Sequence, residues 1–216
     1  MCNLVTLNAS TDEVATHFKA RRPKATNVSP GDAYPGGQGF VVREETGERI
    51  VQPMTWGFPV RLKTMKPTSK PKPVNNARDD KLLTFWRPWF TDPAQRCLIP
   101  FTSFAEAEGE KGKMTRTWIS VADQPLAAWA GLWRPSDEWG DCYTGVMVDA
   151  TEKLWHIHDR MPVILQPADH EAWLRAPAEE AMALVAKYSA DLLVVERTDV
   201  PWFSRKPAAP DAPVLL

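Results

Sequence analysis

Short runs of apolar residues dominate the hydrophobic pattern of this chain. They are rich in β-branched and aromatic residues and are bounded by glycine, proline or charged residues, which is typical of β-strands. The runs cover residues 40–42, 49–52, 96–99, 117–121, 127–133, 143–148, 161–165 and 192–196. No regular alternation of strand and helix links them, so the pattern favours an α+β fold built on antiparallel sheet.

Four segments have the spacing or the boundary residues of helices. Ser10 and Glu13 form a capping-box pattern, which predicts a helix over residues 10–20. A second helix is expected within residues 76–90, and its inward side chains would be Leu82, Leu83 and Phe85. Two further helices are expected at residues 169–175 and 178–188. The intervening residues 27–39, rich in proline and glycine, are expected to form a loop.

The length and composition predict one domain. A chain of 216 residues that is 44% hydrophobic can form one sizeable core. We expect antiparallel sheets in an open, barrel-like core over residues 2–200, then a proline-rich tail over residues 201–216. No stretch is long and apolar enough to span a membrane, and we expect no membrane association. Three widely spaced cysteines do not suggest a disulfide framework, which favours a cytoplasmic location.

Charge is distributed unevenly along a chain whose net charge is −1. Residues 49–78 contain no acidic residue but carry seven basic ones, namely Arg49, Arg61, Lys63, Lys66, Lys70, Lys72 and Arg78. Such a run is often only a solvated loop. Here it is interleaved with Trp56 and Phe58, and a basic groove with aromatic platforms is typical of single-stranded nucleic-acid binding.

Cys2 directly follows the initiator methionine. Removal of Met1 would leave a free α-amine next to a thiol, with reference pKa values of about 8 and about 8.5. The amine can condense with an aldehyde to an imine, and the thiol can then close a five-membered thiazolidine ring. Cys2 is therefore either a nucleophile or an idle small residue, since unreactive cysteines are common.

Three internal segments carry further candidate chemistry. In the segment 76–78, the Asn76 amide and the Arg78 guanidinium could hold a phosphate or sugar, or Asn76 could cap a helix. Glu106 follows the apolar run at 96–99 and is expected in a loop that presents its carboxylate, or it is one more surface acid. His156 and His158 have the spacing of one strand face and could be half of a zinc site. No further ligands stand at a recognisable spacing, so no metal is predicted.

Together these segments resemble a known family. Five motifs occur in the order Met1-Cys2, Trp56-Gly57-Phe58, Asn76-Ala77-Arg78, residues 96–100 with Glu106, and residues 158–162. They resemble those of the SOS response-associated peptidases (SRAP), also described as abasic-site processing proteins. The resemblance extends over nearly the whole chain. The family usually has Gly-Arg after the cysteine, where this chain has Asn3-Leu4.

The resemblance implies a function in the DNA damage response. The protein would remove its own Met1 and crosslink Cys2 to abasic sites in single-stranded DNA, acting as a monomer without a cofactor, with possible lyase activity and nucleoid association. Cys2 would be the nucleophile, Asn76 would position the sugar, Glu106 would transfer protons, and His158 would assist ring opening and reversal. The DNA-binding surface would comprise Trp56, Gly57, Phe58, Lys63, Lys66, Lys70, Lys72, Arg78 and Arg160.

Two alternatives remain at this stage. The first is a cysteine-type peptidase in which Cys2 and His158 form a dyad that acts on other proteins. The second is a non-covalent module that binds single-stranded DNA through the basic stretch and its aromatic residues. Discrimination between abasic and intact DNA would separate this module from the crosslinking protein.

Overall fold

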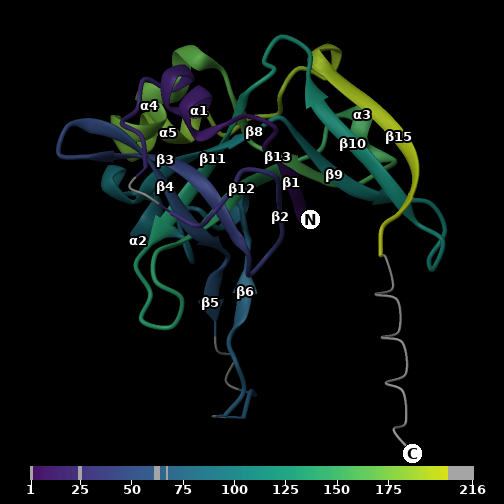
Figure 1. Cartoon of the computed structure of the whole chain (residues 1–216), viewed down its shortest axis with the longest axis horizontal. Coiled ribbons are helices and arrows are strands. Elements are labelled where there is room, and N and C mark those ends of the chain that lie inside the picture. The colour runs from purple at the N-terminus through teal and green to yellow at the C-terminus, as the bar shows by residue number, and fades with distance from the viewer. Residues whose placement is uncertain (1, 24–25, 61–63, 67, 204–216) are drawn as a thin grey trace, which may run out of the picture.

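The computed structural model describes residues 2–23, 26–60, 64–66 and 68–203, and its many strands and few short helices confirm the α+β prediction (Figure 1). The described strands are Leu4–Thr6 (β1), Asp32–Ala33 (β2), Gln38–Glu45 (β3), Glu48–Trp56 (β4), Phe58–Val60 (β5), Lys72–Val74 (β6), Asn76–Arg78 (β7), Arg96–Phe101 (β8), Ser103–Glu108 (β9), Thr115–Val121 (β10), Ala127–Arg134 (β11), Cys142–Asp149 (β12), Arg160–Pro162 (β13), Ile164–Leu165 (β14) and Leu193–Pro201 (β15). The described α-helices are Thr11–His17 (α1), Arg87–Phe90 (α2), Glu152–Trp155 (α3), His170–Arg175 (α4) and Ala178–Ala183 (α5).

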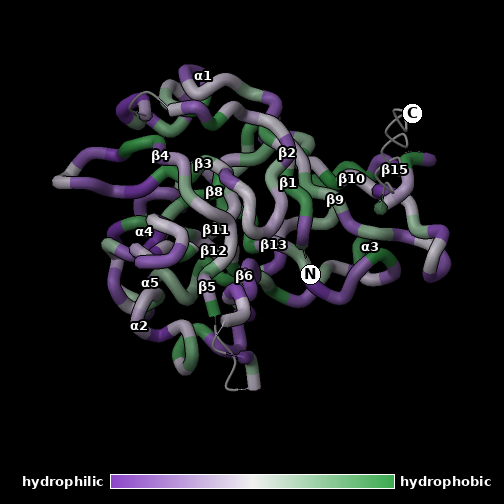
Figure 2. The backbone as a smooth tube through the Cα atoms, turned by 60° about the horizontal axis from the view of Figure 1, so that its bottom comes forward, coloured by the Kyte–Doolittle hydropathy of each residue, from purple (hydrophilic) through white to green (hydrophobic). Residues whose placement is uncertain are grey.

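The larger sheet closes on itself. Strand β12 pairs in parallel with β4, β4 pairs with β3, β3 with β8, β8 with β11, and β11 returns to β12. Every residue of β8 is buried, because it is covered on both faces. Apolar residues lie among these central strands, whereas the projecting β3–β4 hairpin is largely hydrophilic (Figure 2). This ring of strands therefore encloses much of the apolar core.

A second sheet carries the start of the chain. Its order is β15-β10-β9-β1-β2, and all of its described pairings are antiparallel. In Figure 1 this sheet extends to the right of the ring, while α1, α4 and α5 gather on the left. Strand β1 lies between β2 and β9, and the register pairs Leu4 with Ala105. Glu106 is therefore placed beside the N-terminal strand by backbone pairing.

A helix does lie within residues 76–90, but it is short and begins only at Arg87. Residues 76–78 form strand β7, which pairs in parallel with β12, and only Arg87–Phe90 is α-helical. Leu82 is buried as expected, but Leu83 and Phe85 are 57% and 56% exposed. The segment forms a strand because the β12 backbone supplies hydrogen-bond partners, a tertiary interaction that outweighs local helix propensity.

Several other boundaries also differ from the sequence prediction. The capping box is confirmed, since the Ser10 hydroxyl accepts from the Glu13 N–H and the Glu13 carboxylate accepts from the Ser10 N–H. The loop predicted at 27–39 contains β2, and the helix predicted at 178–188 ends at Ala183. Residues 204–216 of the predicted tail lie outside the described residues. None of the described helices is long and apolar enough to cross a membrane.

Gly145 provides a test of core packing. A Cβ atom at this position would lie 1.9 Å from Cζ2 of Trp129, whose indole N–H donates to the Val146 carbonyl at 2.6 Å. Overpacking of a buried site typically costs about 1–3 kcal/mol. We expect Gly145→Ala to lower the free energy of unfolding, measured by urea denaturation, by about 3 kcal/mol or more.

Gly112→Ala is the control for this substitution. Gly112 has a φ of +92°, but a Cβ atom at this position would meet no atom of a non-neighbouring residue within 4 Å. The control should therefore lose only the roughly 1–2 kcal/mol that a left-handed backbone costs an alanine. An equal loss in both variants would show that contact with Trp129 does not limit residue 145.

Candidate active site

Cys2 is buried immediately before β1, with 0% of its surface exposed. Its thiol donates a long hydrogen bond of 3.7 Å to the Leu4 carbonyl. Its backbone carbonyl accepts two hydrogen bonds, from Nδ2 of Asn75 and Nδ2 of Asn76, each at 3.0 Å. Two amides on consecutive residues therefore fix the position of Cys2.

The asparagines are in turn fixed by the ring of strands. Asn76 belongs to β7 and lies opposite Gly145 of β12. The Asn75 carbonyl accepts hydrogen bonds from the Trp56 indole at 3.0 Å and from the Gly145 N–H at 3.2 Å. Asn75 also donates to the Asn3 side chain at 3.0 Å. Sequence reasoning missed Asn75, although it directly precedes Asn76 and shares its side-chain chemistry.

Glu106 lies on strand β9, so the loop expected for it is wrong. Its side chain is buried, its residue is 4% exposed, and Oε1 has no hydrogen-bond partner. Burial, with a smaller contribution from the Asp159 charge, raises the pKa of Glu106 to about 7. Burial also raises the pKa of the Cys2 thiol, and the Glu106 charge raises it further. The two groups therefore interact electrostatically in one buried region.

His158 lies in the turn between α3 and β13. Its Nδ1 accepts a hydrogen bond from the Arg160 N–H at 2.9 Å, which places the proton of the neutral ring on Nε2. Asp159 Oδ1 is also 2.9 Å from Nδ1 and would form an ion pair if the ring were protonated. Burial is the main cause that lowers the His158 pKa. Since the Asp159 charge acts on Glu106, this turn lies near the buried carboxyl.

His156 does not share a strand face with His158, because both residues lie in the turn after α3. The His156 Nε2 atom is instead 2.9 Å from Arg197 Nη2 and 3.9 Å from Glu108 Oε1. Among the described residues, no three His, Cys, Asp or Glu side chains form a group that could hold a metal ion.

The aromatic residues expected at the DNA surface are buried. Trp56 is 0% exposed and stacks on Tyr143 with ring centroids 6.2 Å apart, and Phe58 is 2% exposed against Trp86 and Trp89. The expectation that Trp56 and Phe58 form exposed stacking platforms is therefore wrong.

The backbone conformation and packing at Gly57, between these two aromatic residues, explain why this position is a glycine. Its φ is +113°, and a Cβ atom there would lie 2.5 Å from the Pro73 Cβ. Glycine is the residue that accepts both a left-handed backbone and this close approach. The Trp56-Gly57-Phe58 motif therefore joins β4 to β5 and packs the core.

The basic residues expected at the DNA surface fall into two groups, exposed lysines and arginines that pair with carboxylates. Lys66, Lys70 and Lys72 are exposed on or near the projecting β5–β6 hairpin, whereas Lys63 lies outside the described residues (Figure 1). Arg78 pairs with Asp80 at 2.9 Å. Arg160 pairs with Asp79 at 2.6 Å and with Asp149 at 3.3 Å. A phosphate would have to compete with these carboxylates for either arginine.

Proteins of known sequence resemble this chain over most of its length. The abasic site processing protein YoqW of Bacillus subtilis is 26% identical over 208 residues, which cover 88% of this chain and 89% of YoqW. The abasic site processing protein HMCES of Pongo abelii is 28% identical over 186 residues, covering 68% of this chain and 52% of HMCES.

Solved structures share the fold. A protein of Bordetella bronchiseptica is 27% identical with a TM-score of 0.76, and the match covers 91% of this chain and 99% of that protein. A protein of Bacteroides thetaiotaomicron is 18% identical with a TM-score of 0.75, and covers 91% of both chains. The family model described as SOS response associated peptidase (SRAP) matches residues 1–199, and the chain belongs to this family.

Proposed function

We propose that this protein crosslinks Cys2 covalently to the aldehyde of an abasic site in single-stranded DNA, after it has removed its own Met1. The observation that carries the proposal is the fixed position of Cys2 beside a buried, titratable Glu106. The names of the relatives, abasic site processing proteins, support the lesion as the substrate. Met1 lies outside the described residues.

The reaction needs two bond-forming steps. The free α-amine of Cys2 adds to the aldehyde carbon of the opened sugar, and the resulting carbinolamine loses water to give an imine. The thiol sulfur then adds to the imine carbon, the thiol proton is transferred to the nitrogen, and a thiazolidine results. Both steps require a proton donor and a proton acceptor, a combination that one carboxyl with a pKa near the ambient pH provides.

Glu106 suits this role because its pKa of about 7 gives comparable populations of both forms at neutral pH. The acid would protonate the departing hydroxyl, and the carboxylate would accept the thiol proton. The unpartnered Oδ1 of Asn76 is a ready acceptor for a hydroxyl of the opened sugar. The Nε2–H of neutral His158 would donate to the sugar oxygen during ring opening and reversal.

The peptidase alternative is disfavoured by the state of the thiol. A cysteine peptidase uses a thiolate whose pKa is lowered by a paired histidine. Here burial and the Glu106 charge raise the Cys2 pKa, and the thiol hydrogen-bonds to the Leu4 carbonyl. Crosslinking tolerates this state because the amine, not the sulfur, forms the first bond.

Burial of Trp56 and Phe58 likewise weakens the non-covalent alternative, which depends on exposed aromatic rings.

The first prediction from the proposed function concerns the thiol. Cys2→Ala should abolish the heat-stable crosslink to an abasic oligonucleotide, because no thiazolidine can close. Its free α-amine should still form an imine that borohydride traps, visible as a shifted band on a denaturing gel. Cys142→Ser, which alters another buried cysteine, should crosslink normally. A heat-stable crosslink in Cys2→Ala would refute the proposed ring.

The second prediction concerns proton transfer. Glu106→Gln keeps the size and polarity of the side chain but cannot titrate. We expect crosslinking to slow by roughly 10²–10⁴-fold with little change in DNA affinity, and we expect the rate to lose its dependence on pH near 7. Glu110→Gln, at an exposed site beyond β9, is the control. A rate unchanged from wild type would exclude Glu106 as the proton-transfer group.

The same variant has a distinct stability profile. The pKa of Glu106 is higher in the folded protein than in the unfolded chain, so the folded protein binds the Glu106 proton more tightly. The protonated side chain therefore contributes to the free energy of unfolding at low pH, and this contribution is lost as the pH rises through about 7. The raised pKa corresponds to roughly 3 kcal/mol. Urea denaturation at pH 5 and pH 8 should show Glu106→Gln gaining stability relative to wild type at the higher pH.

The third prediction concerns the β5–β6 hairpin. Each contact between a lysine and a phosphate releases counterions and adds about 0.7 to the slope of log affinity against log salt for a single strand. Changing Lys66, Lys70 and Lys72 together to Gln should therefore weaken DNA binding and lower the slope by about 2. The same change at Lys111, Lys113 and Lys187, which are exposed elsewhere, should leave both nearly unaltered. Equal slopes in the two variants would show that the hairpin does not contact DNA.

A further inference from the structure

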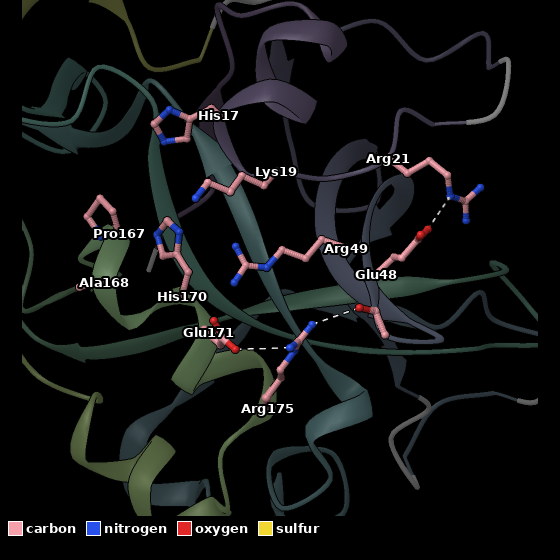
Figure 3. A pocket seen from close by; sticks show the side chains of 11 residues that line it. His17, Lys19, Arg21, Glu48, Arg49, Pro167, Ala168, His170, Glu171 and Arg175 are labelled. Carbon is pink, nitrogen blue, oxygen red and sulfur yellow. Dashed lines mark hydrogen bonds and ion pairs between the residues drawn. The ribbon is translucent and has the colours of Figure 1, made fainter.

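A cleft of about 840 Å³ lies away from Cys2, between the end of α1, the β3–β4 hairpin and the start of α4 (Figure 3). In both Figure 1 and Figure 2, α1 and α4 stand on a different side of the molecule from the N-terminus. The site described above uses none of the residues that line this cleft. Its volume is within the range of about 300–1,000 Å³ typical of small-molecule sites.

Basic groups converge in the cleft. Figure 3 shows the Lys19 amine and the Arg49 guanidinium extending toward the His170 ring, with the His17 ring beside them. Among the described residues, no ion pair is formed by Lys19. Lys19 follows shortly after the end of α1, and its backbone φ of +51° is unusual for a lysine. The four basic side chains come from three separate parts of the chain.

His170 supplies the second observation. It is 5% exposed, it lines the cleft, and its Nε2 has no hydrogen-bond partner. The backbone of Leu165 hydrogen-bonds to the same side chain, and the Phe18 ring packs against it at 5.3 Å between centroids. A buried nitrogen without a partner costs about 1–3 kcal/mol. Its position at the wall of the cleft allows it to bond to a molecule bound there.

The acidic residues around the cleft are paired with arginines. Glu171 contacts Arg175 at 3.3 Å, and Glu48 contacts Arg21 at 3.8 Å. Glu44 lies 3.0 Å from Arg175 and 3.6 Å from Arg49. These pairs offset the local negative charge, so Lys19 and the two histidines dominate the chemistry of the inner wall.

We propose that this cleft binds the phosphate group of a small phosphorylated molecule. Lys19 supplies the main charge, and the Arg49 guanidinium, which also pairs with Glu44 at 3.6 Å, adds a second charged donor. His17 and His170 lie on the opposite side. The His170 ring already donates to the Leu165 backbone, so its Nε2 donates to a phosphate oxygen only when the ring is protonated. The cleft is larger than one phosphate requires, and Pro167 and Ala168 give it an apolar wall for the organic part of the ligand.

Proton uptake should accompany binding. Burial lowers the pKa of His17, and burial together with the Arg49 and His17 charges lowers the pKa of His170 to about 4. The titratable and charged groups that line the cleft with His170 include His17 from α1, Lys19, Arg49 from β4, and Glu171 and Arg175 from α4. A bound dianion would favour the protonated form of both histidines. Affinity should therefore rise as the pH falls from 8 to 6.

Isothermal titration calorimetry tests this site. The probes are sulfate, which keeps its charge over this pH range, inorganic phosphate and a deoxynucleoside 5′-monophosphate. Lys19→Gln should weaken binding of all three by about tenfold or more, the equivalent of one charge-assisted hydrogen bond. Lys113→Gln removes an exposed charge outside the cleft and should bind as wild type does.

The outcomes are distinct. Binding of sulfate that is tighter at pH 6 than at pH 8, and weakened by Lys19→Gln alone, supports the site. No heat of binding with any probe, or equal affinity in the two variants, overturns it. An oligonucleotide with only internal phosphodiesters identifies the other source of phosphate. If only this oligonucleotide is sensitive to Lys19→Gln, a small-molecule ligand is excluded.

Discussion

The pair of hydrogen bonds from Asn75 and Asn76 to the Cys2 carbonyl is the interaction on which the rest of this site depends. Each neutral bond of this kind contributes only about 1 kcal/mol net. Their value lies in position, because chain ends are otherwise among the least ordered parts of a protein. The two amides join the start of one sheet to the closed ring of strands formed by the other.

Burial of Cys2 and Glu106 disfavours their charged forms, and the proposed chemistry depends on this effect. Cys2 and Glu106 are both withdrawn from water, which disfavours the thiolate and the carboxylate alike. Glu106 also retains an unpartnered oxygen, and Asn76 has another. Such unsatisfied polar atoms are costly in a native protein. Both atoms belong to residues whose strands or side chains lie beside Cys2, where they could bond to a bound substrate.

The sequence predicted the local features and missed those that depend on long-range pairing. The helix at Ser10 was predictable because its capping box lies within four residues, and the apolar runs became strands. The strand at Asn76 was not, because its partner β12 lies about seventy residues away in the chain and no local pattern specifies that pairing. Glu106 was expected in a loop for the same reason.

The basic and aromatic composition of residues 49–78 did not predict which of these side chains are exposed. Trp56 and Phe58 stand within a basic stretch, yet both rings are needed to fill the core, and the Trp56 indole supports Asn75. The candidate catalytic residues Cys2, Asn76, Glu106 and His158 were predicted from the order of the family motifs, because each of them alone also has an ordinary structural explanation. The structure brings Cys2, Asn76 and Glu106 together by pairing β1 with β9 and β7 with β12.

Intact-protein mass spectrometry tests the central claim most directly. The purified protein should have the mass of a chain that begins at Cys2. After mixing with an abasic oligonucleotide, its mass should increase by that of the oligonucleotide less one water, and peptide mapping should place the adduct on the first residue. A crosslinked protein that retains Met1, or an adduct on any other residue, would contradict the proposed thiazolidine.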